Sequence, residues 1–352
     1  MTGQIRRRLL VVLAGLLVGA ACSSDPPAPT AAPTTEAGEF EAKPTISLVV
    51  NDWTGSALNV AVAEQVIEFG LGYPVVAVRL DDTTGMYDEI AEGNVDAVLE
   101  VWPSAVTERD QRFFDRGQVV QLGELGVVGR VGWFVPRYVV DDDPSLDTWE
   151  GFASNDVAAR FATSATRPQG RFLGTNPDYR QFDADIIDNL GLPFEVEFSG
   201  SEAATMAELD ESVSERDPIL LYWWTPTAAV AAYDLVRVEL PEADEECLAA
   251  FDSGVGDIDC DYQPDVLIKV ASTDLATKAP QVQRFLQAFE LTNDDQARML
   301  NAVEIQGATI DAAAADWIDS NPEVYQGWLD AARSGPADDG EATDGAADDG
   351  EG

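Results

Sequence analysis

Short hydrophobic runs alternate with longer amphipathic stretches from Pro44 onward. Runs of this kind predict buried strands, and the amphipathic stretches between them predict helices. The alternation is typical of an α/β protein with a largely parallel sheet. The first series predicts strands at 46–50, 75–80 and 95–101, with helices at 56–69, 86–91 and 106–114.

A second series of the same kind follows residues 131–135, with strands predicted at 171–173, 194–198 and 219–222 and a helix at 182–190. One more strand is predicted at 266–270, and the helical stretches after it are expected to return to the first lobe. Single cores rarely grow beyond roughly 250 residues, so a chain of 352 residues is expected to hold two of them. The predicted fold class is α/β with two lobes, one formed by residues 44–132 together with 238–333 and the other by residues 133–237.

The first 22 residues have the pattern of an export signal. Three arginines at 6–8 precede an apolar run at 9–18 that is too short to span a bilayer stably. The run ends in Gly19-Ala20-Ala21-Cys22, which resembles the lipobox of bacterial lipoproteins and predicts lipidation of Cys22. Residues 23–43 are rich in Pro, Ala and Thr and are expected to form a flexible tether. We therefore expect an exported protein, lipid-anchored on the outer face of the cytoplasmic membrane in a periplasmic or extracellular location.

Acidic residues dominate the charge of the chain, with 64 Asp and Glu against 21 Lys and Arg. The net charge of −43 excludes binding to the phosphate backbone of a nucleic acid. Such acidity is typical of a solvated, self-repelling surface. Residues 334–352 contain seven of the acidic residues and no basic or aromatic one, so this tail is expected to be disordered.

Histidine is absent from the sequence, which removes the Ser-His and Cys-His catalytic pairs and the common zinc sites. Beyond Cys22 only Cys247 and Cys260 remain, and in an oxidising compartment this pair predicts a disulfide. No metal site, cofactor or catalytic residue is expected. A glycoside hydrolase that works with two carboxylates needs no histidine and stays open as an enzymatic alternative. With no histidine to titrate, ligand affinity is predicted to be nearly flat between about pH 5.5 and 8.

Three tryptophans stand where a predicted strand ends: Trp53, Trp102 and Trp224. Tyr179 lies just beyond the strand predicted at 171–173. In parallel α/β sheets ligands bind outside the carboxyl ends of the strands, so the four rings are expected to line one cleft. Ring faces attract a trimethylammonium group through their quadrupoles. Stacking on a sugar is the main alternative, and it would make the chain a carbohydrate-binding lipoprotein.

Four short motifs give the chain a family resemblance: Asp52-Trp53-Thr54-Gly55, Glu100-Val101-Trp102-Pro103, Tyr222-Trp223-Trp224-Thr225-Pro226, and Ala315-Asp316-Trp317-Ile318 followed by Gly327-Trp328. Between about residues 44 and 332 the sequence resembles the glycine betaine, proline betaine and choline substrate-binding proteins of ABC transporters. The resemblance implies the two-lobed type II periplasmic-binding fold, with the ligand in a cleft between the lobes. It also implies a monomer that closes around a small quaternary-ammonium solute and delivers it to an ABC permease in the membrane.

The resemblance places the aromatic cage on Trp102 and Trp224. Trp53 matches a wall found in the choline-binding branch, and Tyr179 stands where a tryptophan is often found. Trp223 and Trp224 alternate across a strand end, so only one of them is expected to face the cleft, and the match of the motif favours Trp224.

The polar end of the ligand is less well defined by the resemblance. Betaine binders hold the carboxylate with backbone N–H groups at a helix start and often with a histidine, which is absent here. The helix that opens at 176–181 offers free N–H groups, and Arg180 is expected to add a charged contact. Choline binders carry an aspartate where this chain has Gly55, so glycine betaine is favoured over choline, although Asp52 and Asp178 could replace that carboxylate.

The remaining tryptophans singled out by the sequence are expected to be mostly structural. Trp317 and Trp328 lie among apolar neighbours at helical spacing, which predicts packing in the core. Trp133 stands beside a possible crossover between the lobes and could either line the cleft or support that crossover.

Overall fold

The computed structural model describes residues 42–80 and 83–335. The predicted signal peptide, Cys22, nearly all of the tether and the acidic tail from residue 336 lie outside these residues. The strands of the described part are β1 Ile46–Val50, β2 Val75–Arg79, β3 Ala97–Val101, β4 Val119–Pro136, β5 Gly170–Gly174, β6 Phe194–Phe198, β7 Leu220–Thr225, β8 Leu235–Arg237 and β9 Asp265–Ser272.

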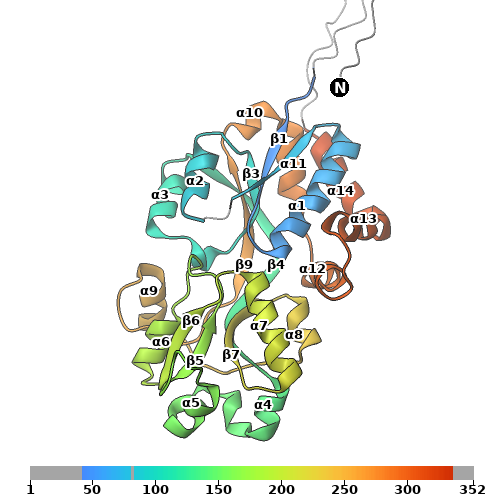
Figure 1. The fold of residues 1–352 in the computed structure, drawn as a ribbon. Helices are drawn as coiled ribbons and strands as arrows, with labels where there is room; N and C mark the ends of the chain where they lie inside the picture. Colours follow the sequence, from blue (N-terminus) through green and yellow to red (C-terminus); the bar gives the residue numbers. More distant parts are fainter. Residues whose placement is uncertain (1–41, 81–82, 336–352) are drawn as a thin grey trace, which may run out of the picture. The chain divides into compact units, whose positions relative to one another are not determined.

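The helices surround these strands (Figure 1). The α-helices are α1 Thr54–Val66, α2 Thr83–Ala91, α3 Glu108–Asp115, α4 Arg137–Asp142, α5 Asn155–Phe161, α6 Asp183–Asn189, α7 Glu202–Glu215, α8 Ala228–Ala232, α9 Glu245–Ser253, α10 Leu275–Lys278, α11 Pro280–Ala288, α12 Asn293–Leu300, α13 Ile310–Ser320 and α14 Pro322–Arg333. Two π-helical segments are η1 Ile67–Leu71 and η5 Asn301–Ile305, and three short 3-10 helices are η2 Pro103–Ala105, η3 Pro144–Asp147 and η4 Trp149–Ala153.

The first lobe is built on a sheet with the strand order β2-β1-β3-β9-β4. Strands β2, β1 and β3 are parallel, whereas β9 runs antiparallel to both β3 and β4. Successive side chains of a strand point to opposite faces of its sheet. Leu48 of β1 accordingly joins the core that contains Trp317 and Trp328, and Val49 joins the core on Met86. Because β1 is buried on both faces, its residues are apolar except for Ser47, which hydrogen-bonds to Asp96.

The C-terminal helices pack on the first lobe, as the sequence analysis expected. Trp317 of α13 and Trp328 of α14 stack with their ring centroids 5.6 Å apart and their planes 8° apart. Both are buried in the core that includes Leu48 and Phe285. These two tryptophans therefore hold helices together and take no part in the cavity described below.

Strand β4 is 18 residues long and belongs to both lobes. It pairs with β9 as far as Gly129 and with β7 from Arg130 onward (Figure 1). The sequence indicated only its end, at 131–135. Its first half contains glycines with positive φ at Gly123 and Gly126, and the register with β9 shifts beside them, which breaks the alternation that marks a strand.

The second lobe is built on β4, β7, β5 and β6, with β8 pairing to β4. Its core contains Trp133 and Trp223, both fully buried. Residues 238–262 also pack here, whereas the sequence analysis assigned them to the first lobe. The reason is apolar and ionic, since Leu240 and Ile258 are buried in this core and Asp261 pairs with arginines of β4 and β8, while the disulfide between Cys247 and Cys260 closes the segment on itself. The return to the first lobe takes place along β9.

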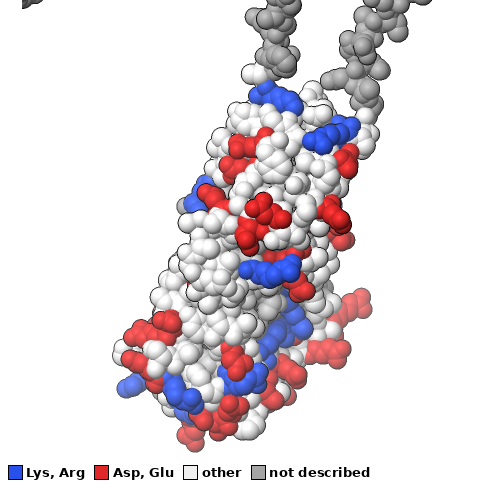
Figure 2. Space-filling view, turned by 90° about the vertical axis from the view of Figure 1, so that its right-hand side faces the viewer, with Lys and Arg blue, Asp and Glu red and all other residues white. Residues whose placement is uncertain are grey.

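The surface carries charges of both signs on the face shown in Figure 2, where acidic and basic side chains are interspersed. The net charge of the chain is therefore not gathered into one patch on that face. Within the described residues, no helix combines the length and the apolar composition needed to cross a bilayer.

Candidate ligand-binding site

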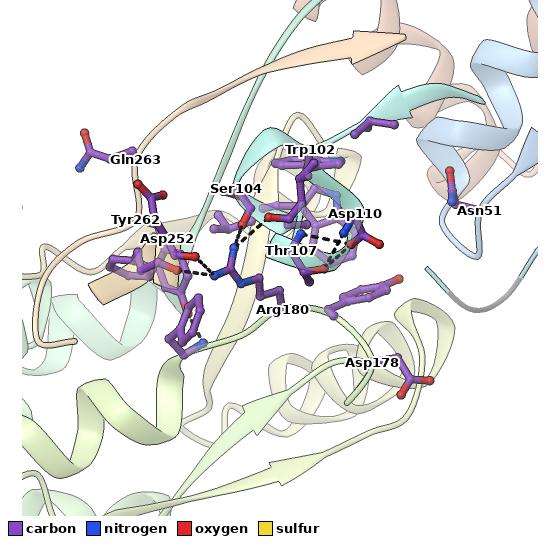
Figure 3. A pocket seen from close by; sticks show the side chains of 18 of the residues that line it. Asn51, Trp102, Ser104, Thr107, Asp110, Asp178, Arg180, Asp252, Tyr262 and Gln263 are labelled. Carbon is purple, nitrogen blue, oxygen red and sulfur yellow. Dashed lines mark hydrogen bonds between the residues drawn. The ribbon is translucent and has the colours of Figure 1, made fainter. Parts of the chain in front are cut away.

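A cavity of about 550 Å³ is lined by residues of both lobes (Figure 3). All four rings named by the sequence line it. Trp102 follows directly after β3, Trp53 is the third residue after β1, Trp224 is near the end of β7, and Tyr179 follows β5. The strands end at the edges of the two sheets that face each other, which is where α/β folds bind ligands.

The ring of Tyr179 contacts those of Trp53 and Trp224 edge to face. The ring of Tyr179 lies 5.8 Å from that of Trp53, at 87°, and 6.1 Å from that of Trp224, at 79°. Trp224 in turn stacks on Trp223, with centroids 4.5 Å apart and planes 25° apart. Trp224 lines the cavity, while the indole N–H of Trp223 donates to Thr227 Oγ1 inside the core. Of the two adjacent tryptophans, the structure thus places Trp224 on the cavity, but the stacked rings lie side by side and not on opposite faces of β7.

Glu100 holds two of the cage tryptophans. Its Oε1 accepts hydrogen bonds from Trp53 Nε1 at 2.7 Å and from Trp102 Nε1 at 3.1 Å. Its Oε2 accepts from Asn59 Nδ2 at 2.6 Å and from Gln296 Nε2 at 3.1 Å. Burial raises the pKa of Glu100 to about 6, although these four hydrogen bonds favour its ionised form. One buried carboxylate therefore fixes both indoles.

The sequence analysis quoted Glu100 within a motif but gave it no role. A signal was present, because Glu100 is the one charged residue of β3, whose five residues are all buried. A buried charge requires partners. What the sequence did not show is that these partners are the two tryptophans and two amides, since they come from three separate stretches of the chain.

The backbone of β4 confines the ring of Trp102. A Cβ atom placed on Gly129 would lie 2.3 Å from Cη2 and Cζ3 of this ring, far inside van der Waals contact. Gly129 is the residue at which β4 changes partner from β9 to β7. Glycine is therefore needed here because the indole lies directly against the main chain.

Asp52 holds the ring of Tyr179 in place from outside the cavity wall. Tyr179 Oη donates to Asp52 Oδ1 at 3.0 Å, and Asn176 Nδ2 donates to Asp52 Oδ2 at 2.7 Å. Burial, followed by the charge of Asp52, raises the pKa of Tyr179 well above its usual range, so the hydroxyl stays protonated. Asp52 is not among the residues that line the cavity, whereas Asp178 lines it and is exposed. Of the two aspartates named by the sequence, one orients a ring and the other lies at the rim.

Arg180 lies on the cavity wall, but its guanidinium is directed to backbone carbonyls (Figure 3). Nη1 donates to the carbonyl oxygens of Ser104 at 2.8 Å and Val106 at 3.3 Å in the first lobe. Nη2 donates to those of Phe251 and, at 2.9 Å, Asp252. The sequence analysis expected Arg180 to bind a ligand carboxylate. The structure instead shows a bridge between the loop after Trp102 and the disulfide-linked segment.

A second contact between the lobes involves buried carboxyl groups. Thr54 of α1 donates to Glu202 Oε2 of α7 from its amide at 2.9 Å and from its hydroxyl at 3.2 Å. Burial, and then the nearby charge of Glu304, raises the pKa of Glu202 to about 8. Burial also raises the pKa of Glu304 to about 7. The predicted flat response to pH rested on the absence of histidine, and these carboxyl groups remove that basis because they titrate in the same range.

Trp133 does not line the cavity. It is fully buried, and its Nε1 donates to Asp183 Oδ1 at 2.7 Å. The same oxygen accepts from Tyr262 Oη at 2.9 Å, and Tyr262 is a cavity-lining ring. Burial raises the pKa of Asp183 to about 7. Trp133 therefore supports the cavity wall through a buried carboxyl group.

Two hydroxyl groups on the wall, those of Ser104 and Thr107, are bonded within the protein, whereas the buried hydroxyl of Tyr87, which also lines the cavity, has no hydrogen-bond partner among the described residues. Ser104 Oγ donates to Asp265 Oδ2 at 2.7 Å, and Thr107 Oγ1 donates to Asp110 Oδ2 at 2.6 Å. In the part of the chain that the structure describes, no three side chains of metal-ligating type form a cluster. The cavity therefore offers mainly aromatic ring faces, and hydrogen bonds to the protein hold the polar edges of Trp53, Trp102 and Tyr179 in place.

Comparison with known proteins identifies the family and the fold. The family model described as the substrate-binding domain of ABC-type glycine betaine transport systems matches residues 44–320. A trimethylamine N-oxide-binding protein of Pelagibacter ubique is 24% identical over 293 residues, which are 81% of this chain and 90% of that protein.

Two solved structures show the same fold. Lactococcal OpuAC, in its closed conformation with glycine betaine, matches with a TM-score of 0.62 and 18% identity over 82% of this chain and 100% of its own. An ABC-transporter choline-binding protein in complex with choline matches with a TM-score of 0.61 and 18% identity over 81% of this chain and 91% of its own. The two-lobed α/β fold expected from the sequence is thereby confirmed. Since the family model covers most of the chain, this protein belongs to the family of substrate-binding domains of ABC-type glycine betaine transport systems.

Proposed function

We propose that this chain captures a solute with a trimethylammonium group, of the glycine betaine or choline type, in a cage formed by Trp53, Trp102, Tyr179 and Trp224. Its family consists of extracytoplasmic solute-binding proteins that work with an ABC permease. The observation that carries the proposal is the convergence of these four rings, from both lobes, on one cavity. Anchoring to the membrane through a lipidated Cys22 is part of the same proposal and rests on the sequence.

The physical reason lies in the ligand. A trimethylammonium group has a charge but no N–H with which to make hydrogen bonds, so it is recognised by faces of negative potential. Each aromatic face contributes about 0.5–2 kcal/mol, more when water is excluded. The N–H edges of Trp53 and Trp102 are bound by Glu100, and the hydroxyl of Tyr179 by Asp52. These bonds preorganise the cage, so little side-chain freedom has to be lost on binding.

Closure of the lobes completes the cage. Tyr179 and Trp224 belong to the second lobe, and Trp53 and Trp102 to the first. The contacts from Arg180 to the loop after Trp102 join the two sides. We propose that the ligand stabilises this closed arrangement, which is the form delivered to the permease.

The same geometry gives less support to two other functions, sugar binding and glycoside hydrolysis. Sugar binding needs several free hydrogen-bonding groups around the rings, but the hydroxyls of Ser104 and Thr107 are bonded to aspartates of the protein, and only that of Tyr87 is recorded without a partner among the described residues. For glycoside hydrolysis, Glu100 is not available as the acid or base, because both of its oxygens are already occupied by four donors.

Calorimetric titration of the purified chain tests the proposal. The ligands are glycine betaine, choline, proline betaine, carnitine and trimethylamine N-oxide, with glucose and maltose as the sugar arm. We expect heat from at least one trimethylammonium compound, and about five- to thirtyfold weaker binding in Trp102→Ala and in Trp224→Ala. Heat from a sugar alone would overturn the cage, and loss of ligand with time would indicate an enzyme.

A further inference from the structure

Carboxylates outnumber guanidinium groups on the cavity wall. Among the described residues, the charged side chains that line it are Glu100, Arg109, Asp110, Asp178, Arg180 and Asp252. This balance bears on the second half of the ligand, the part that is not trimethylammonium. A zwitterion brings a carboxylate into the cavity, and a buried carboxylate needs a cation or several donors.

The two guanidinium groups of the wall are committed to other partners. Arg180 donates to four backbone carbonyls, two in each of the segments that it joins. Arg109 forms an ion pair with Asp88 of α2. Neutralising a ligand carboxylate with either of them would break contacts that the structure already makes.

Most of the backbone donors near the cage are committed as well. In the loop after Trp102, the amides of residues 104–107 all donate within the protein. In the segment after β5, the amides of Asp178, Tyr179 and Phe182 do the same. For the amides of residues 180 and 181 the structure records no acceptor. The hydroxyl of Tyr87, which also lines the cavity, has no partner in the described part of the chain either. These three donors are all neutral, and neutral donors do not offset the charge of four carboxylates.

Glu100 supplies a negative charge next to the cage. It is buried, and the indole N–H groups of Trp53 and Trp102 both point at its Oε1. With a pKa of about 6 it is mostly ionised at pH 7.5. A cation held on the faces of these two rings is attracted to that carboxylate in a region of low dielectric, whereas an anionic group is repelled.

We infer that this cavity selects a quaternary-ammonium alcohol such as choline, whose net charge is positive, over a zwitterion of the same size such as glycine betaine, with Glu100 as the counter-charge. The inference rests on the proposed function and deepens it. From Gly55 the sequence favoured glycine betaine over choline, and the inference reverses that preference. The four carboxylates on the cavity wall favour a cation more strongly than the absence of one aspartate disfavours it.

The test compares matched ligands on the purified chain at pH 7.5 by calorimetry. Choline and glycine betaine share the trimethylammonium group and differ in a hydroxymethyl group against a carboxylate. The third ligand is 3,3-dimethyl-1-butanol, which has the shape of choline without its charge. We expect choline to bind at least tenfold more tightly than either of the other two.

Two variants locate the charge that discriminates. Glu100→Gln keeps an acceptor oxygen for the indoles but removes the charge, and it is expected to reduce the ratio of choline to glycine betaine affinity by at least fivefold. Asp252→Asn, at an exposed position of the same wall, removes the same charge and is expected to change the ratio by less than twofold. If Glu100→Gln does not fold, the comparison of the three ligands on the unmodified chain still tests whether the cavity prefers choline to glycine betaine.

Each outcome has a separate meaning. Glycine betaine binding as tightly as choline, or more tightly, would overturn this inference and leave the proposed function standing. Equal effects of Glu100→Gln and Asp252→Asn would overturn the role of Glu100, because general negative potential would then explain the ratio. No binding of any trimethylammonium compound would overturn the proposed function itself.

Discussion

Gly129→Ala should weaken ligand binding without removing any aromatic ring. The added Cβ would lie 2.3 Å from two carbons of the Trp102 ring, and ordinary contacts between carbons are about 3.5–4.0 Å. The ring must therefore retreat by roughly 1 Å or more. Its hydrogen bond to Glu100 is 3.1 Å long, and a shift of that size breaks it.

The magnitude follows from the loss of one cage face. A displaced indole no longer presents its face to the cation, which costs about 1–2 kcal/mol and corresponds to roughly five- to thirtyfold weaker binding. Overpacking at the strand also lowers the free energy of unfolding by about 1–3 kcal/mol. Calorimetric titration measures the first effect, and thermal melting measures the second.

Gly327→Ala is the matched control. Gly327 is an exposed residue of α14, and a Cβ there meets nothing within 4 Å. Alanine in a helix is more stable than glycine by up to about 1 kcal/mol, so this variant should melt slightly higher and bind unchanged. If Gly129→Ala is folded and its dissociation constant stays within twofold of the unmodified chain, the ring of Trp102 is not held in place by β4 and the reasoning is wrong.

Three further predictions concern the contacts around the cage. Arg180→Lys keeps the charge but cannot reach four carbonyls at once, so calorimetry should show affinity about fivefold lower; unchanged affinity would mean that the bridge does not stabilise closure. Glu202 has a raised pKa, so the folded state binds its proton more tightly than the unfolded state and stability falls as pH rises from about 4.5 to 8. Glu202→Gln should flatten this fall in melting curves between pH 5 and 9, and parallel curves would contradict it. Reducing the disulfide between Cys247 and Cys260 should cost roughly 3 kcal/mol of stability and, because the linked segment supplies carbonyls to Arg180, weaken binding more than threefold; an intact affinity after reduction would count against the second part.

The strands and the ring positions could be predicted because their signals are local. Residues 46–50 and 194–198 form strands with the predicted bounds. Trp53, Trp102 and Trp224 were placed at strand ends from the sequence, and the ends of parallel strands are where ligands bind in each lobe of an α/β fold. The position of these rings along the chain was therefore enough to bring them to a common cavity.

The contacts that tune the cavity could not be predicted because their partners are distant in sequence. Thr54 and Glu202 are 148 residues apart, and Gln296 and Glu100 are 196 apart. From the sequence Arg180 was a free cation at a helix start, but in the fold four carbonyls surround its guanidinium.

The sequence by itself determined the α/β class, the two lobes and which aromatic residues stand at strand ends, because hydrophobic periodicity and residue order are sufficient for these. The tertiary structure alone decided which lobe holds residues 238–262, which side chain holds each ring, and which charges are already paired. Those properties depend on neighbours in space. Burial raises the pKa values of Glu100, Glu202 and Glu304 to between about 6 and 8. In a chain without histidine, these buried carboxyl groups are therefore the ones that titrate near neutral pH.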